Sequence, residues 1–184
     1  MNENEIEQTA LELLGKLGYE TLYGPDCVEA SIQSHEDEEK HEYYTDYAER
    51  ESFSDIILKS RLKKALIRIN LTIPDDAIEQ AIKKVTTLSS PELITNNEQF
   101  HKYIFEGVSV EYKTKTGDIK HDIVRIIDFD NVINNDFVTI NQFKIIENRE
   151  NRRPDIVIFI NGLPLVIIEL KNPENPTADI QEAF

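Results

Sequence analysis

Hydrophobic residues in the first half of the chain recur three or four residues apart, the spacing that places side chains on one face of an α-helix. This pattern predicts four helices, over residues 6–17, 52–69, 75–88 and 96–106. In the first helix the apolar positions are Ile6, Ala10, Leu13, Leu14 and Leu17. Gly15 or Gly18 is expected to end that helix. Ser52 or Ser54 is expected to cap the second helix, and Gly107 to end the fourth.

After residue 107 the pattern changes to short apolar runs rich in β-branched residues, which are typical of strands. The expected strands cover residues 108–113, 119–129, 137–146, 155–160 and 165–170. Thr116-Gly117-Asp118 and Asn161-Gly162-Leu163-Pro164 carry hairpin-turn sequences between consecutive strands. Helices first and strands later predict an α+β fold, in which a helical N-terminal half packs on a mixed central β-sheet.

The same change of pattern divides the chain into two expected regions. Residues 1–95 form a helical N-terminal region, and residues 96–184 form a core that carries the sheet. Within the first region, residues 24–50 contain few aliphatic side chains and the acidic run Glu36-Asp37-Glu38-Glu39. Such a composition is typical of a loop or a weakly structured insertion.

Composition narrows the class of protein. The 184 residues, 40% of them hydrophobic and 30% charged, are enough to bury a core and ordinary for a soluble globular protein. The single cysteine, Cys27, excludes an internal disulfide and fits a reducing compartment. No apolar run of membrane-spanning length and no signal-peptide pattern occurs, so we expect a cytoplasmic protein without membrane association. No Gly-x-x-x-x-Gly-Lys-Ser/Thr motif occurs, so this segment is not expected to bind ATP.

The overall charge disfavours binding of nucleic acid, whereas a local group of cations favours it. The net charge of −15 disfavours tight DNA binding by this segment alone, because affinity for DNA comes largely from basic surfaces. Several cations nevertheless lie close in sequence near residue 150, and two of them, Arg152 and Arg153, are candidate phosphate contacts. A solvated pair, or a salt bridge to the acidic surface, is the favoured alternative for these two arginines.

Charged residues interrupt the last two apolar strands only at the ends away from their turn. Asp155 begins one strand, and Glu169-Leu170-Lys171 ends the next, so a hairpin brings these groups together. Side-chain alternation along a strand would place Glu169 and Lys171 on one face. Carboxylates are the hard oxygen ligands that Mg²⁺ prefers, and burying them without a cation is costly. The pattern therefore indicates a divalent-metal site, with a structural ion pair as the alternative.

Pro154-Asp155, followed fourteen residues later by Glu169-Leu170-Lys171, resembles the catalytic signature of the PD-(D/E)xK nuclease superfamily. A longer block is similar to the N-terminal nuclease region of the R (restriction, or motor) subunit of type I restriction enzymes. That block comprises residues 151–157, 161–165 and 169–173, with further matching pieces at 69–70, 107–110, 127–129 and 134–138. The similarity runs from about residue 53 to the end, and more loosely from residue 5.

This resemblance implies a type I site-specific deoxyribonuclease, with a restriction-endonuclease-like domain that uses Mg²⁺ to hydrolyse DNA phosphodiester bonds. It implies that Asp155 and Glu169 hold the metal, and that Lys171 positions the attacking water and stabilises developing charge. The implied partners are DNA, a modification methyltransferase and a specificity subunit. ATP is expected to bind only in a full-length protein, outside this segment. The family's Gln-x-x-x-Tyr element is expected beyond Phe184, so the core in this segment is expected to be truncated before its next helix is complete.

Two other functions are compatible with the residues. One is a non-catalytic module that keeps the same fold for assembly with partner subunits. The other is a stand-alone PD-(D/E)xK nuclease that acts on branched or single-stranded DNA. Some nucleases of the superfamily add a helix-borne glutamate near the metal; Glu98 is one candidate among several and is left unassigned. Gln142 is similar to a glutamine in the family's strand, or is a polar residue at a sheet end.

Overall fold

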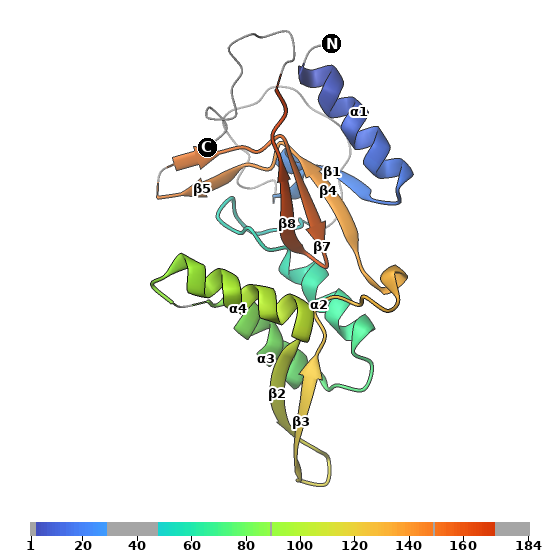
Figure 1. Cartoon of the computed structure of the whole chain (residues 1–184), viewed down its shortest axis with the longest axis vertical. Coiled ribbons are helices and arrows are strands. Elements are labelled where there is room, and N and C mark those ends of the chain that lie inside the picture. Colours follow the sequence, from blue (N-terminus) through green and yellow to red (C-terminus); the bar gives the residue numbers. More distant parts are fainter. Residues whose placement is uncertain (1–2, 29–47, 89, 149, 172–184) are drawn as a thin grey trace. The chain divides into compact units, whose positions relative to one another are not determined.

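The computed structural model describes residues 3–28, 48–88, 90–148 and 150–171 (Figure 1). These residues form helices and a mixed β-sheet, so the expected α+β class is confirmed. The chain divides into two compact units. The sheet unit comprises Met1–Leu58 with Phe137–Phe184, and the helix–hairpin unit comprises Lys59–Asp136. Each unit is described by itself.

A four-stranded sheet forms the centre of the sheet unit, in the order β1-β4-β7-β8. The strands are β1 (Glu20–Tyr23), β4 (Phe137–Asn141), β7 (Ile156–Ile160) and β8 (Leu163–Ile168). β1 runs parallel to β4, whereas β4, β7 and β8 pair in antiparallel fashion. The unit also contains α1 (Glu3–Lys16), the 3₁₀ helix η1 (Gly24–Cys27), β5 (Ile145–Glu147) and β6 (Glu150–Arg152), and β5 pairs with β6.

Apolar side chains of β4 and β7 fill the core of the sheet unit. β7 is buried along almost its whole length, as expected for an interior strand covered on both faces. Phe143 and Phe159 meet edge to face, with ring centroids 5.2 Å apart. The other buried members of this cluster are Cys27, Leu58, Val138, Ile140 and Val157.

The turn between β7 and β8 is tighter than expected. Ile160 pairs with Leu163, so Asn161 and Gly162 alone form the turn. Their φ angles are 52° and 77°, the left-handed values that a two-residue type I′ hairpin requires at both positions. β8 therefore starts two residues before the expected position 165, and it ends at Ile168 instead of residue 170.

The helix–hairpin unit contains α2 (Lys59–Ile69), α3 (Asp75–Thr86), α4 (Leu93–Glu106), β2 (Val108–Lys113), β3 (Ile119–Val124) and the 3₁₀ helix η2 (Val132–Asn134). β2 and β3 form the expected antiparallel hairpin. One face of α3 is buried through Ala77, Ile78, Ala81 and Val85, and this helix packs against β2. Gly107 ends α4 as predicted, with a left-handed φ of 81°.

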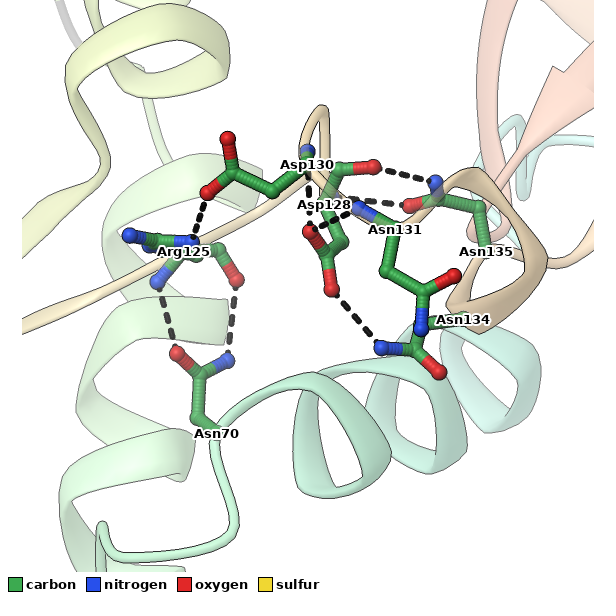
Figure 2. A network of polar contacts seen from close by, with 7 residues as sticks. All are labelled: Asn70, Arg125, Asp128, Asp130, Asn131, Asn134 and Asn135. Atoms are coloured by element: carbon green, nitrogen blue, oxygen red, sulfur yellow. Dashed lines mark hydrogen bonds and ion pairs between the residues drawn. The ribbon is translucent and has the colours of Figure 1, made fainter.

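A network of polar contacts organises the loop that follows β3 in the helix–hairpin unit (Figure 2). Asn70, just after α2, donates to the carbonyl of Arg125 and accepts from its backbone N–H, at 2.9 and 2.8 Å. The Asp128 carboxylate accepts from the backbone N–H groups of Asp130 and Asn131 and from the Asn134 side chain. The strand expected over residues 119–129 therefore stops at Val124, because these hydrogen bonds replace a ladder.

Several expected helix ends move once tertiary contacts are known. The helix predicted from residue 52 begins at Lys59, so the predicted serine caps were wrong. Ser52 instead donates to the Asp55 carboxylate at 2.9 Å, and Leu58 inserts fully buried into the core of the sheet unit. α1 ends at Lys16, and Gly18, with φ of 93°, provides the expected left-handed residue after it.

The described part of the chain bears on two further expectations. Most of the acidic segment 24–50 lies outside the described residues, and its beginning is the 3₁₀ helix η1. The two compact units have other bounds than the expected regions 1–95 and 96–184, and that division stays a prediction. Among the described residues, no helix is both long and apolar enough to cross a membrane.

Candidate active site

Asp155 lies immediately before β7, at the end of the sheet away from the Asn161-Gly162 turn. Two hydrogen bonds fix this residue. Its backbone carbonyl accepts from the N–H of Gln142 at 2.9 Å, and its carboxylate Oδ2 accepts from the N–H of Leu170 at 2.7 Å. The carboxylate is therefore held against the segment that follows β8.

Glu169 lies opposite Asp155 across the end of the β7–β8 hairpin, because the last ladder pair is Ile156 with Ile168. The pKa of Glu169 lies above its ordinary value of 4.5. Partial withdrawal from water raises it most, the nearby Asp155 carboxylate raises it further, and the Lys171 ammonium opposes both. Asp155, Glu169 and Lys171 are thus brought within electrostatic reach of one another.

Two details of this arrangement differ from expectation. Glu169 and Lys171 follow β8 instead of belonging to it, so strand alternation is not what gathers them. Both side chains are exposed and Asp155 is half-buried, so the argument from the cost of full burial does not apply. The feature that remains is the close approach of two carboxylates, which raises the free energy of their ionised pair.

The donor set fits a hard divalent cation. Two carboxylates are the ligand type that Mg²⁺ selects, and Mg²⁺ commonly takes only one or two protein carboxylates and fills its other positions with water or phosphate. A cation between Asp155 and Glu169 would also remove the repulsion that raises the pKa of Glu169. Within the described residues no group of three or more His, Cys, Asp or Glu side chains could hold a metal, so any third protein ligand from that part of the chain would be of another kind.

Glu7 was missed by the sequence reasoning, although it lies behind this site. Only 9% of its surface is exposed, and its two carboxylate oxygens accept from the side-chain amides of Asn141 and Gln142 at 2.7 and 2.8 Å. Gln142 is the residue whose backbone N–H binds Asp155. The periodicity of the first helix could have pointed to Glu7, because it lies one turn before Leu11.

The buried face of α1 is shifted from the one expected, because Ile6, Ala10 and Leu14 are only half-buried. Glu7 and Leu11 are its buried residues, whereas Leu13 and Leu17 are 56% and 75% exposed. Glu7 was not among the positions predicted for the buried face. The structure buries it because two amides of the sheet edge complement its charge.

The remaining candidates divide between the two units. Arg152 is exposed in β6 and pairs with Glu150 at 3.4 Å, in agreement with the salt-bridge alternative. Arg153 is exposed two residues before Asp155. Gln142 directly follows β4, as expected of a polar residue at a sheet end. Glu98 lies on the exposed side of α4 in the helix–hairpin unit, where it lines a shallow pocket with Asn97, His101 and Lys102.

The family model for the N terminus of the type I restriction enzyme R protein matches residues 1–184, the whole chain. The chain belongs to this family. It is 37% identical over its full length to the type I restriction enzyme HindI endonuclease subunit of Haemophilus influenzae. It is 35% identical, also over its full length, to a protein of Methanocaldococcus jannaschii assigned as a type I restriction enzyme MjaIXP endonuclease subunit.

These relatives are much longer than the chain. The 184 residues span 16% of the length of each of the two relatives. A second M. jannaschii relative, assigned as the MjaVIIIP endonuclease subunit, is 34% identical over 74% of the chain. The chain is therefore similar to the N-terminal part of restriction endonuclease subunits, and the suspected family is confirmed.

Proposed function

We propose that this chain is the Mg²⁺-dependent endonuclease domain of a type I restriction enzyme R subunit, and that it hydrolyses phosphodiester bonds of DNA. The observation that carries the proposal is the approach of Asp155 and Glu169 at the end of the β7–β8 hairpin, beside Lys171. Membership of the R-protein N-terminal family supports the same conclusion. The proposal assigns the site as well as the reaction.

Each residue of the site has a distinct role. Asp155 and Glu169 would hold Mg²⁺, which supplies Lewis-acid stabilisation of charge on the reacting phosphate and lowers the pKa of a bound water. Asp155 is kept in place by the Leu170 N–H, which leaves its second oxygen to face the metal. The ammonium of Lys171 orients the attacking water and stabilises negative charge that develops on the phosphate.

The distribution of charge supports work within a larger complex. Residues 59–136 contain 12 Lys/Arg and 12 Asp/Glu, so the whole net charge of −15 belongs to the rest of the chain, which carries the site. An excess of negative charge of this size repels DNA at long range. We infer that an ATP-dependent motor, in the part of a full-length subunit that this chain does not cover, and methyltransferase and specificity subunits bring DNA to the site. Arg152 and Arg153 would then contact phosphate locally.

Cleavage of supercoiled plasmid by the full-length R subunit, assembled with its partner subunits, ATP and Mg²⁺, tests this function. Lys171→Ala should lower the cleavage rate by about 10²- to 10³-fold, the usual loss when one electrostatic contact to the transition state is removed. ATP hydrolysis should continue. Lys115→Ala, at the exposed turn of the β2–β3 hairpin, is the matched control and should cleave normally.

The outcomes separate the alternatives. Equal cleavage by wild type and Lys171→Ala would refute the role of Lys171. No cleavage by either protein, with ATP hydrolysis intact, would favour the non-catalytic assembly module. Cleavage that needs neither ATP nor partner subunits would favour a stand-alone nuclease.

A further inference from the structure

The turn after β4 carries features that its local sequence does not require. Gln142 has a φ of 54°, a left-handed conformation that is unfavourable for a residue with a side chain. Its N–H nevertheless binds the carbonyl of Asp155 at 2.9 Å. A disfavoured conformation persists only where surrounding contacts hold it, and such positions concentrate at functional sites.

Glu7 of α1 holds this turn from one side. Its Oε1 accepts from Asn141 Nδ2 at 2.7 Å, and its Oε2 accepts from Gln142 Nε2 at 2.8 Å. Hydrogen bonds to a carboxylate are stronger than those between neutral groups, and burial of Glu7 strengthens them further. Both oxygens of Glu7 are thus used by neighbouring amides.

Gly24 of η1 holds the turn from another side. A Cβ atom at Gly24 would collide with the carbonyl oxygen of Gln142 and would lie 2.8 Å from that of Asn141. The two backbones therefore approach more closely than any other residue would allow. The turn is enclosed between η1 and α1, and its position is fixed by contacts that come from distant parts of the sequence.

We propose that Glu7 is a positioning residue for Asp155 and that it acts through Gln142. This inference rests on the proposed nuclease function. The connection runs from the Glu7 carboxylate to the Gln142 side-chain amide, and from the Gln142 backbone N–H to the Asp155 carbonyl. It fixes the backbone of Asp155 from one side, while the Leu170 N–H fixes its carboxylate from the other.

A direct metal-ligand role for Glu7 fits the contacts less well. Its oxygens are already engaged by two amide donors. Within the described residues, Glu7 also forms no group with Asp155 and Glu169 that could hold a metal. Support of a ligand by residues behind it is a general feature of metal sites, and loss of such support lowers metal affinity or activity by about 10- to 100-fold.

The test exchanges the two polar groups. In Glu7→Gln, the new amide can accept from Asn141, but both hydrogen bonds lose their charged acceptor, and the two NH₂ groups meet unless the Gln142 amide turns over and gives up its present orientation. In Gln142→Glu, two carboxylates face each other. The double variant Glu7→Gln, Gln142→Glu restores both hydrogen bonds with the net charge unchanged, because the amide of residue 7 donates to the carboxylate of residue 142.

Two readouts on the full-length subunit distinguish positioning from folding. The first is plasmid cleavage in the assembled enzyme, separated into kcat and KM for DNA. The second is the affinity for Mn²⁺, measured without nucleotide. Only the binding that the double variant Asp155→Ala, Glu169→Ala abolishes is counted. Each single variant should lower kcat and Mn²⁺ affinity about tenfold, with KM unchanged, and the exchange should restore both. Glu12→Gln, which removes an exposed charge from the same helix, should match the wild type.

Wild-type kcat and Mn²⁺ affinity in Glu7→Gln would overturn the proposal. It would also be overturned if the double variant Glu7→Gln, Gln142→Glu had the thermal stability of the wild type but did not regain kcat and Mn²⁺ affinity. If Glu7→Gln does not fold, Gln142→Met provides the same test, because it keeps the backbone N–H and removes only the amide that Glu7 holds. Normal kcat in Gln142→Met would then overturn the proposal. Full cleavage by Asp155→Ala, Glu169→Ala would instead refute the nuclease function itself.

Discussion

Two aspartates, one in each unit, have opposite surroundings. In the helix–hairpin unit the Asp128 carboxylate accepts three hydrogen bonds from N–H groups, and these hold its pKa below the ordinary value. In the sheet unit the Asp155 carboxylate accepts one hydrogen bond from Leu170 and lies beside a second carboxylate, whose pKa it helps to raise. The first aspartate is surrounded by hydrogen-bond donors, whereas the second faces another carboxylate.

The difference in surroundings distinguishes a carboxylate that stabilises the fold from one that is available to a ligand. A carboxylate surrounded by donors stabilises the fold and has little capacity left for a ligand. Two carboxylates placed together raise the free energy of the ionised state, and a cation lowers it again. Charged residues alone do not distinguish these cases, because each aspartate adjoins an apolar run in the sequence: Asp128 follows one and Asp155 precedes one.

The largest expected effect is on catalysis at the pair of carboxylates Asp155 and Glu169. Asp155→Asn should lower plasmid cleavage by the assembled enzyme about 10³-fold, because it removes a charged metal ligand. Its thermal stability should be equal to or slightly above that of the wild type, since repulsion of Glu169 is relieved. Asp76→Asn, an exposed change in the first turn of α3, serves as the control. Loss of stability in parallel with loss of cleavage would show that the Asp155 carboxylate is structural after all.

A smaller effect, on stability alone, is expected in the network of Figure 2. The buried Asn135 side chain accepts from the Asp128 N–H and donates to the carbonyls of Asp128 and Val132. Asn135→Ala should lower the free energy of unfolding by about 2–3 kcal/mol, because buried backbone groups lose their partners. Urea denaturation measures this change.

Asn131→Ala is the matched control for that measurement. Asn131 is exposed, and its bond to Asp128 comes from the backbone N–H, which the substitution keeps. Its free energy of unfolding should stay within about 0.5 kcal/mol of the wild type. An equal loss in both variants would mean that the network is not what organises this loop.

The smallest effects concern pH, and their signs should be opposite in the two units. The folded-state pKa of Asp128 lies below its ordinary value of 3.8, because N–H groups of Asn131 and Asn134 stabilise the charged form. Its contribution to stability is therefore complete above pH 3.8 and is lost as the pH falls through the folded-state pKa. Asp128→Asn should weaken this acid sensitivity, whereas Asp130→Asn, which removes an exposed ion pair with Arg125, should not.

Glu169 should show the reverse dependence. Its folded-state pKa lies above 4.5, so its contribution is present below pH 4.5 and is lost as the pH rises through the folded-state pKa. Glu169→Gln should remove this loss, and Mg²⁺ should offset it in the wild type. Unfolding midpoints in urea across the two pH ranges would measure both trends, and trends of the same sign would remove the contrast between the units.

Local signals in the sequence predicted the part of the fold that short-range chemistry controls. Asn161-Gly162 specified a two-residue turn, because both positions need a left-handed φ that these residues adopt readily. That turn sets the pairing of Ile160 with Leu163, and a register shift between Ile158 and Phe159 then places Asp155 opposite Glu169. The approach of the two outer strand ends was therefore readable from sequence, whereas the register shift and the end of β8 at Ile168 were not.

Other features depend on contacts between distant residues. The start of α2 was placed too early, because Leu58 joins the core of the sheet unit instead of a helical stripe. Asn70 meets Arg125 across 55 residues, and this contact ends β3 early. The hydrophobic pattern around Asn70 gives no sign of its contact with Arg125, and the pattern around Arg125 gives no sign of Asn70.

The sequence by itself determined the family, the α+β class and the hairpin that gathers Asp155, Glu169 and Lys171, because these depend on motifs, on hydrophobic periodicity and on turn chemistry. Only the tertiary structure decided the surroundings of each carboxylate. Glu7 and Asn141 are 134 positions apart, yet their contact turns an apparently solvent-facing glutamate into a buried support of the Asp155 segment. The physical reason is that the free energy of a charge is set by the donors and charges around it, and folding chooses those neighbours.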